Sequence, residues 1–383
     1  MLHSWRHLQR ASRFSYGSTT TSIGGKGENK WGKPFRSRCF PPHANASLYN
    51  TAQGDHWAVT EEMYRAEKRG GINGLVVSHS AVDMFSMTII ENSRHRDGSI
   101  YRNKAFEGHF CITNRDETRL EPMMFSEPTD CRPSWETCSM HSACAMMQIF
   151  SLKLAKIPID NDCIQLYGYI AVRDDLDKLL NYVVNYSRDN PIIMRQGDLI
   201  EMTGPKRGIS MCCSVLLEFD MRIKKGEQEK DDLQLIDGAI DYIGLITATF
   251  PFTKRINGDC GAVDITLARV YWAVEATIQV IISDVQSGFN LYLSSLCFVS
   301  DVWKEIQLFN GPIGESCGLR RYVVAVSLDT WMHLKLKVGQ KGSNHYVERY
   351  CSFKAINHGC SSQQILGELA SISMKVTWST LLD

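Results

Sequence analysis

The chain has 383 residues, and its 42 Lys and Arg residues equal its 42 Asp and Glu residues in number, so overall charge favours neither nucleic acid nor a membrane surface as a partner. The longest apolar run, 273–282, is shorter than the ~20 residues of a membrane-spanning helix, and no such span is expected. Thirteen cysteines without an apolar secretory segment indicate reduced thiols in a protein that is not secreted.

The first forty residues are basic and rich in Ser, Thr and Gly. Eight Lys and Arg residues face a single acid, Glu28, and Leu2, Trp5 and Leu8 can line one side of a short helix. This composition is typical of an organellar transit peptide, and also of a disordered basic tail. The compartment therefore stays open between the cytoplasm and an organelle, either mitochondrion or chloroplast.

Residues 31–121 give weak and mixed signals. The segment 60–70 is expected to form a short helix, because a Thr N-cap precedes acids in the first turn and a Gly pair ends it. A strand-like segment, 74–78, follows, whereas 91–98 and 113–118 are polar and turn-prone. We expect residues 1–121 to be a variable, partly disordered extension without a core of its own.

From residue 122 onward, apolar and polar residues alternate in run after run. The alternation is complete in 217–224 and recurs in 274–282, 332–338 and 372–378, which places successive side chains on opposite faces of a strand. Roughly ten strands bounded by turns predict a mainly β fold, with a large antiparallel β-sandwich-like domain over residues 122–383. Only 174–186 is ambiguous, and it fits either a helix or a loop followed by a strand.

The segment Thr203-Gly-Pro-Lys-Arg-Gly208 has a superficial likeness to a phosphate-binding loop. It lacks the G-x-x-x-x-G-K-[ST] spacing, and no helical pattern follows it. We therefore expect a hairpin-type turn that exposes Lys206 and Arg207 for contact with an acidic partner.

Several motifs along this region resemble a plant domain of unknown function, number 6598, that is expanded in grasses. They occur in order at 147–154, 167–174, 180–182, 203–209 and 218–224, and the likeness continues through 256–264 to 376–379. No activity is assigned to that family. In some cereal jasmonate-induced proteins a similar domain follows a ribosome-inactivating domain, which removes one adenine from ribosomal RNA, so the resemblance implies a link to stress or defence.

The extension of this chain is too short to hold such a ribosome-inactivating domain. Glu62 and Arg65 match the Glu-x-x-Arg pair of those enzymes in spacing, but an ion pair on a short charged helix is the favoured interpretation. No G-x-S-x-G or comparable motif is present, and no catalytic residue is assigned.

Two groups of cysteine and histidine residues supply zinc-type ligands. The first is Cys131, Cys138, His141 and Cys144, and the second is His345, Cys351, His358 and Cys360. Neither group has the paired C-x2-4-C knuckles of common zinc sites. Free thiols are therefore favoured for both, with Cys351 and Cys360 on adjacent strands, and no metal or cofactor is assigned.

Lys335, Lys337 and Lys341 together with His333 can form a basic stripe, beside which Tyr322 or Tyr350 offers a stacking surface for RNA. A solvated strand face that uses lysine against aggregation is favoured over this interpretation.

We therefore expect a non-catalytic interaction module with an unknown protein partner, because a broad β scaffold without a catalytic constellation usually acts through its loops. The alternative is a ribosome- or RNA-directed factor, and that idea depends on the family resemblance alone.

Overall fold

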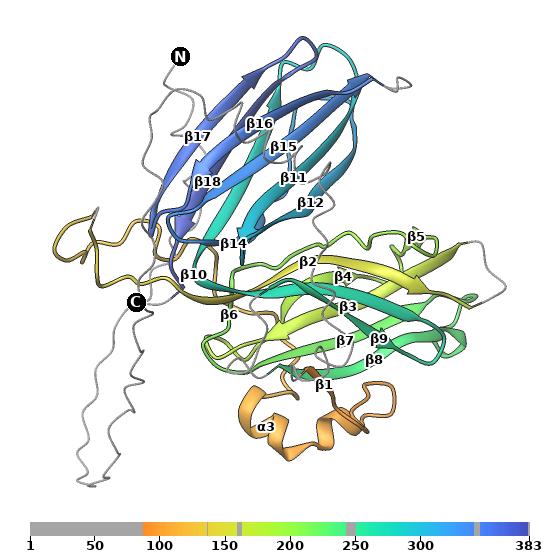
Figure 1. Cartoon of the computed structure of the whole chain (residues 1–383). Coiled ribbons are helices and arrows are strands. Elements are labelled where there is room, and N and C mark those ends of the chain that lie inside the picture. Colours follow the sequence, from red (N-terminus) through yellow and green to blue (C-terminus); the bar gives the residue numbers. More distant parts are fainter. Residues whose placement is uncertain (1–86, 136, 159–162, 243–249, 341–344, 382–383) are drawn as a thin grey trace, which may run out of the picture. The chain divides into compact units, whose positions relative to one another are not determined.

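The computed structural model describes residues 87–381 except 136, 159–162, 243–249 and 341–344 (Figure 1). Four features of the sequence analysis lie outside the described residues. They are the basic start, the expected helix at 60–70, the expected strand at 74–78 and the Glu62/Arg65 pair. The mainly β prediction is confirmed, because the described elements are chiefly strands arranged in three antiparallel sheets. Within these ranges no helix combines the length and apolarity that a membrane crossing requires.

One hydrophobic core lies under a six-stranded sheet. The order in that sheet is β1 (Met87–Ile89), β8 (Leu233–Tyr242), β7 (Val215–Ile223), β3 (Ile164–Arg173) and β4 (Asn181–Tyr186), and β5 (Ile192–Met194) pairs with β3. Its apolar side chains pack against those of β2 (Cys144–Lys156), β9 (Phe252–Asn257) and the first half of β10 (Ala262–Ser283). The alternation in β7 behaves as predicted, since Leu217, Phe219, Met221 and Ile223 are all buried in this core.

A second core lies between two further sheets. The eight-stranded sheet has the order β17 (Gly359–Leu366), β18 (Ser371–Ser379), β10, β2 and β6 (Ile209–Ser210), and β9, β13 (Cys317–Gly318) and β14 (Tyr322–Ser327) also pair with β10. The four-stranded sheet has the order β12 (Val302–Ile313), β11 (Phe289–Val299), β15 (Trp331–Gln340) and β16 (Val347–Lys354). Trp378, fully buried, is the largest side chain of this core.

The 22-residue strand β10 takes part in both cores. Residues 262–270 pair with β2 and β9, whereas residues 273–283 pair with β14 and β18. Between the halves the ladder is irregular, and Trp272 has a φ of 48°. This β-bulge turns Tyr271 and Trp272 outward, so that they are 43% and 53% exposed.

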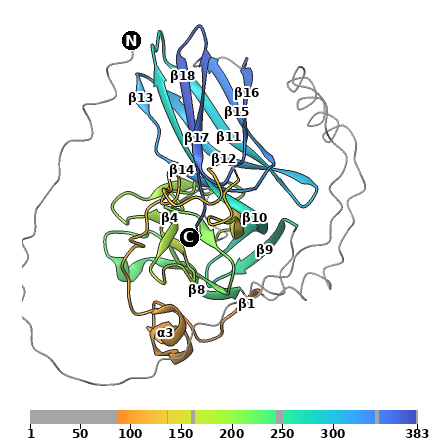
Figure 2. The same ribbon diagram turned by 90° about the vertical axis from the view of Figure 1, so that its left-hand side faces the viewer.

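Part of the expected extension is packed against the domain. A 3₁₀ turn, η2 (Ser99–Arg102), leads into α3 (Lys104–Phe110), where the side chain of Asn103 accepts a hydrogen bond from the N–H of Ala105. Apolar residues of this segment form a small cluster with Leu216 of β7 and Ala239 of β8, and α3 lies beside β8 (Figure 2). The elements β1, η2 and α3 are thus packed on the domain although they lie within the range assigned to the extension.

Two local expectations are resolved by the structure. Segment 174–186 is a loop followed by β4. In the turn 203–208, which contains a cis Gly204–Pro205 bond, the predicted exposure of Arg207 is wrong. Arg207 is 1% exposed, and its guanidinium donates to both carboxylate oxygens of Asp174 at 2.7 Å. Burial of a charge requires such a partner. Lys206 is half-buried and contacts Glu121 and the carbonyl oxygen of Thr118.

Candidate ligand-binding face

The four-stranded sheet turns one face toward the core and carries a polar set of side chains on the other. Leu293, Leu334 and Leu336 lie in the core, and the residues between them in sequence point the opposite way because side chains alternate along a strand. We call the opposite surface the polar face. It comprises Tyr292, Ser294, Glu305, Lys335, Lys337, Glu348 and Tyr350.

Charges on the polar face are compensated by one another. Nζ of Lys335 lies 3.8 Å from a Glu305 oxygen and 4.0 Å from a Glu348 oxygen, and Nζ of Lys337 lies 3.4 Å from Glu348. Glu305 also accepts hydrogen bonds from Ser294 at 2.7 Å and Tyr292 at 3.1 Å.

The titration of Glu348 reflects this pairing. Partial burial favours its neutral form, but the hydrogen bond from Tyr350 and the charges of Lys335 and Lys337 outweigh burial and hold the pKa of Glu348 below its ordinary value. The cluster therefore keeps Glu348 ionised, and its two lysines and two glutamates do not present a net positive surface.

Two hollows flank Tyr292. One, of about 470 Å³, is lined by Asn290, Tyr292, Asn310, Lys337 and Tyr346, together with Leu291 and Gly311. The other, of about 290 Å³, lies between Tyr292, Glu305 and Gln307 and the segment 199–202. The first hollow combines two amide side chains, which donate and accept hydrogen bonds, with two tyrosine rings. Such a lining suits a small polar ligand.

A serine and a histidine lie side by side on the same surface. Oγ of Ser352 is 2.7 Å from Nδ1 of His333, and the ring of Trp303 lies over His333 with centroids 4.9 Å apart. His333 is 3% exposed. Ser352 is half-buried, so the serine is more open to solvent than the imidazole beside it.

The basic stripe expected from the sequence takes a different form. Lys335 is only 2% exposed and contacts two glutamates, so it is not a solvated lysine. Tyr322 belongs to β14 in the eight-stranded sheet and is 4% exposed, so its predicted role as a stacking surface is wrong. Tyr350 does lie on the polar face, and Lys341 is outside the described residues.

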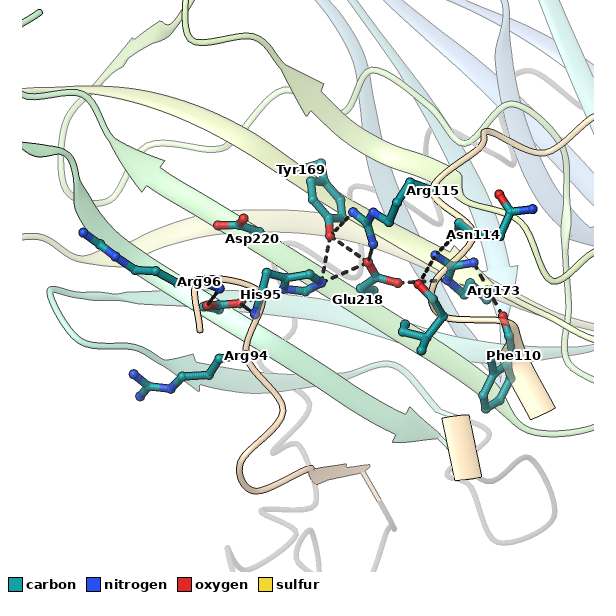
Figure 3. A network of polar contacts seen from close by, with 12 residues as sticks. Arg94, His95, Arg96, Phe110, Asn114, Arg115, Tyr169, Arg173, Glu218 and Asp220 are labelled. Carbon is teal, nitrogen blue, oxygen red and sulfur yellow. Dashed lines mark hydrogen bonds and ion pairs between the residues drawn. The ribbon is translucent and has the colours of Figure 1, made fainter. Parts of the chain in front are cut away.

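A second polar cluster, which the sequence did not suggest, lies on the six-stranded sheet (Figure 3). The carboxylate of Glu218 on β7 accepts hydrogen bonds from Arg173 at 2.9 Å and Tyr169 at 2.7 Å, lies 3.0 Å from a ring nitrogen of His95, and pairs with Arg115. The other ring nitrogen of His95 is 2.7 Å from Asp237. We call this set the Glu218 network.

The Glu218 network resembles a catalytic constellation, but its central groups are buried, and Arg115 is the member that is 36% exposed. The side chains of Glu218 and Arg173 are 0% exposed and that of His95 is 4% exposed. Arg173 further donates to the carbonyl oxygens of Lys178 at 2.7 Å and Asn114 at 2.8 Å. The network therefore binds the segment 94–115 to strands β3, β7 and β8 through buried charge pairs.

The structure divides both cysteine and histidine groups found in the sequence. Cys131, Cys138 and His141 of the first group meet His358 of the second, with all four ligand atoms within 4.8 Å of one another. We call these four residues the Cys/His cluster. Cys144 instead pairs with Cys212, whose hydrogen bond is the chief cause that raises the pKa of Cys144. Cys351 lies buried on β16, Cys360 lies exposed on β17, and His345 is exposed.

Comparisons with known proteins identify a family and little else. A family model described as a domain of unknown function, DUF6598, matches residues 146–377. No curated protein matches the chain. Among solved structures, human GIVD cytosolic phospholipase A2 aligns at 8% identity and a TM-score of 0.21, over 62% of this chain but 33% of that one. A pair of domains from Extended-Synaptotagmin 2 aligns at 11% identity and a TM-score of 0.22, over 68% and 98% of the two chains. Both TM-scores are too low to assign a common fold.

Proposed function

The chain belongs to the DUF6598 family, which is defined by a domain of unknown function, and we propose that it is a non-catalytic binding module that takes a neutral, hydroxyl-rich ligand such as an oligosaccharide on its polar face. The observation that carries this proposal is the hollow lined by Asn290, Asn310, Tyr292 and Tyr346 on a face whose charges are already paired.

Charge compensation argues for a neutral ligand. Affinity for RNA depends on lysines and arginines that can neutralise phosphates. Lys335 and Lys337 form ion pairs with Glu305 and Glu348. A phosphate that approached these lysines would also meet the two carboxylates. The ribosome-directed alternative therefore gains no support from this face.

The lining of the larger hollow matches the chemistry of a sugar. The Asn290 and Asn310 amides each offer donors and an acceptor for hydroxyl groups, and tyrosine rings offer apolar faces against which C–H groups pack. The volume of about 470 Å³ falls within the range of small-ligand sites. Tyr346 is 52% exposed and stands at the rim, where a ring adds contact area at low entropic cost.

The test is binding of the purified full chain to an array of neutral and acidic oligosaccharides, followed by titration calorimetry with the best ligand. Tyr346→Ala and Asn310→Ala remove exposed rim groups, and each is expected to weaken binding at least about tenfold, roughly 1.4 kcal/mol. Tyr271→Ala, which removes a similarly exposed tyrosine on β10, is the matched control and should leave binding unchanged. The proposal fails if no oligosaccharide binds, or if the rim variants bind like the control.

A second candidate, binding of a protein partner, is favoured by the bulge in β10. Tyr271 and Trp272 protrude there, and Arg269 lies over the Tyr271 ring at 4.7 Å. Tryptophan, tyrosine and arginine are the residue types most enriched in interface hot spots. Loss of a captured protein with Tyr271→Ala and Trp272→Ala, but not with Tyr346→Ala, would support this candidate over the first.

A further inference from the structure

Four potential metal ligands point toward a common centre in the Cys/His cluster. Sγ of Cys138 lies 3.2 Å from Nδ1 of His141, Sγ of Cys131 lies 3.9 Å from the same nitrogen, and Sγ of Cys131 lies 3.4 Å from Nε2 of His358. Bond lengths of about 2.3 Å to sulfur and 2.0–2.1 Å to nitrogen in a tetrahedral site separate the ligand atoms by about 3.3–3.8 Å. The three separations given above lie within about 0.1 Å of that range, and all four ligand atoms lie within 4.8 Å of one another.

We propose that Cys131, Cys138, His141 and His358 bind one zinc ion, as a structural site that is independent of the polar face. Two thiolates and two imidazoles form the tetrahedral donor set that selects zinc over magnesium or calcium, which prefer oxygen ligands. Binding releases the two thiol protons to solvent, and the two thiolates then offset the charge of the ion.

The burial of the cluster indicates a closed site. Cys138, His141 and His358 are 8%, 1% and 3% exposed, and Cys131 is half-buried. Four protein ligands occupy all the positions of a tetrahedral ion, and catalytic zinc instead keeps one position open for water or substrate. The site therefore holds the chain in place and is not a reaction centre.

Each of the two imidazoles has a close neighbour besides the other three ligands. Nε2 of His141 lies 3.4 Å from a carboxylate oxygen of Asp130, so a carboxylate stands beside the ring nitrogen that does not face the cysteines. The ring of His358 packs against Trp135 with centroids 4.0 Å apart. Nδ1 of His358 is buried and finds no acceptor among the described residues.

The fold gives the ion a clear structural task. In their described parts, residues 122–143 contain no helix or strand and contribute no fully buried apolar side chain. Three hydrogen bonds attach the segment to the eight-stranded sheet. The N–H of Met123 donates to Glu275, and the N–H of Phe125 donates to Ser379. The carbonyl oxygen of Ser126 accepts from the N–H of Gly359. Zinc would join the far part of this segment to the turn between β16 and β17, where His358 lies, in place of the missing hydrophobic contacts.

The first test is metal analysis of the full chain, expressed with zinc and purified without chelator. We expect one zinc per chain. After exchange for cobalt we expect the near-ultraviolet sulfur-to-cobalt charge-transfer band and the visible bands of tetrahedral cobalt. Cys138→Ser should lower zinc content at least about tenfold. The matched control is Cys360→Ser, which removes an exposed thiol two residues from His358 and should leave zinc content unchanged.

A second variant, in which one metal ligand replaces another, keeps the proposal testable if the first variant misfolds. If Cys138→Ser does not fold, His358→Cys keeps four ligands, and it should still bind cobalt with a stronger charge-transfer band because a third thiolate is added. The proposal is overturned if the folded wild-type chain binds no metal, if mass spectrometry after alkylation shows a Cys131–Cys138 disulfide, or if Cys360→Ser loses as much zinc as Cys138→Ser.

Discussion

Two segments that precede β2 attach to the sandwich in different ways. Residues 94–115 are held by a small apolar cluster with Leu216 and Ala239 and by the Glu218 network, in which carboxylates meet guanidinium and imidazole groups. Residues 122–143 meet the domain at the Cys/His cluster, in which thiols and imidazoles face one another. Neither segment has enough apolar residues for a core of its own.

The difference lies in whether the polar groups complete each other. In the Glu218 network each buried charge faces an opposite charge, and the protein alone satisfies it. In the Cys/His cluster four groups of similar donor type converge, and only a cation at their centre would bind all four. The first attachment is therefore a property of the polypeptide, whereas the second is proposed to depend on the supply of zinc.

The largest expected effect comes from breaking the Glu218 network. Glu218→Gln preserves shape but leaves the fully buried Arg173 without its carboxylate, and removal of one partner of a buried pair costs about 3–5 kcal/mol. We expect a loss of this size in the free energy of unfolding, measured by chemical denaturation.

The matched control for Glu218 is an exposed carboxylate in the 3₁₀ turn η3 (Glu229–Asp231), which connects β7 and β8 of the same sheet. Glu229 pairs with Arg222 at 2.6 Å but is 64% exposed, and Glu229→Gln should cost less than about 1 kcal/mol. Equal losses from the two variants would show that the Glu218 network is no more than a set of surface pairs.

The stabilisation from the Glu218 network should be lost both at low pH and at high pH. Burial favours the neutral form of Glu218, but the hydrogen bond to His95 and the charges of Arg173 and Arg115 outweigh it and hold the pKa of Glu218 below its ordinary 4.5. Its stabilisation is complete above 4.5 and is lost as pH falls through the depressed value.

His95 acts in the opposite direction. Burial lowers its pKa, but hydrogen bonds to Asp237 and Glu218 outweigh burial and raise the pKa above its ordinary 6.5. Its stabilisation is complete below 6.5 and is lost as pH rises through the raised value. Protection of amides in 94–115 from hydrogen exchange, corrected for intrinsic rates, should therefore peak between 4.5 and 6.5. Protection that rises steadily to alkaline pH would contradict this assignment.

The strands could be predicted from the sequence because their cause is local. Alternation along 217–224 shows directly which side chains enter the core, and the same residues are buried in β7. The existence of two cores could not be predicted, because it depends on which strands pair with each half of β10. Alternation shows on which face of a sheet a side chain lies, but it does not show which strands are neighbours in that sheet.

The sites depend on contacts between distant residues, which local patterns do not encode. His358 lies 227 positions after Cys131, so grouping by chain proximity separates these two residues. The same grouping includes Cys144, which instead lies beside Cys212. Arg207 was expected at the surface because its neighbours are turn residues, yet Asp174, 33 positions earlier, compensates its charge in the interior. Lys335 was expected on a solvated strand face, yet it is buried beside carboxylates, as Glu218 is buried beside cationic groups.

The smallest expected effect comes from changing Asp130, the carboxylate beside the Cys/His cluster. This variant distinguishes a residue that supports the ligand His141 from a residue that binds the metal itself. Asp130 does not reach the common centre, and its side chain is 58% exposed. Loss of a carboxylate that orients a metal-binding histidine lowers metal affinity by 10- to 100-fold. The long 3.4 Å contact with His141 and the exposure of Asp130 place the expected loss of affinity at the small end of that range.

Asp130→Asn should therefore weaken zinc binding about tenfold in competition with a chromophoric chelator, while the cobalt spectrum keeps its tetrahedral form. An unchanged affinity would show that Asp130 is only a surface neighbour of His141, and loss of the tetrahedral spectrum would show that it is a ligand.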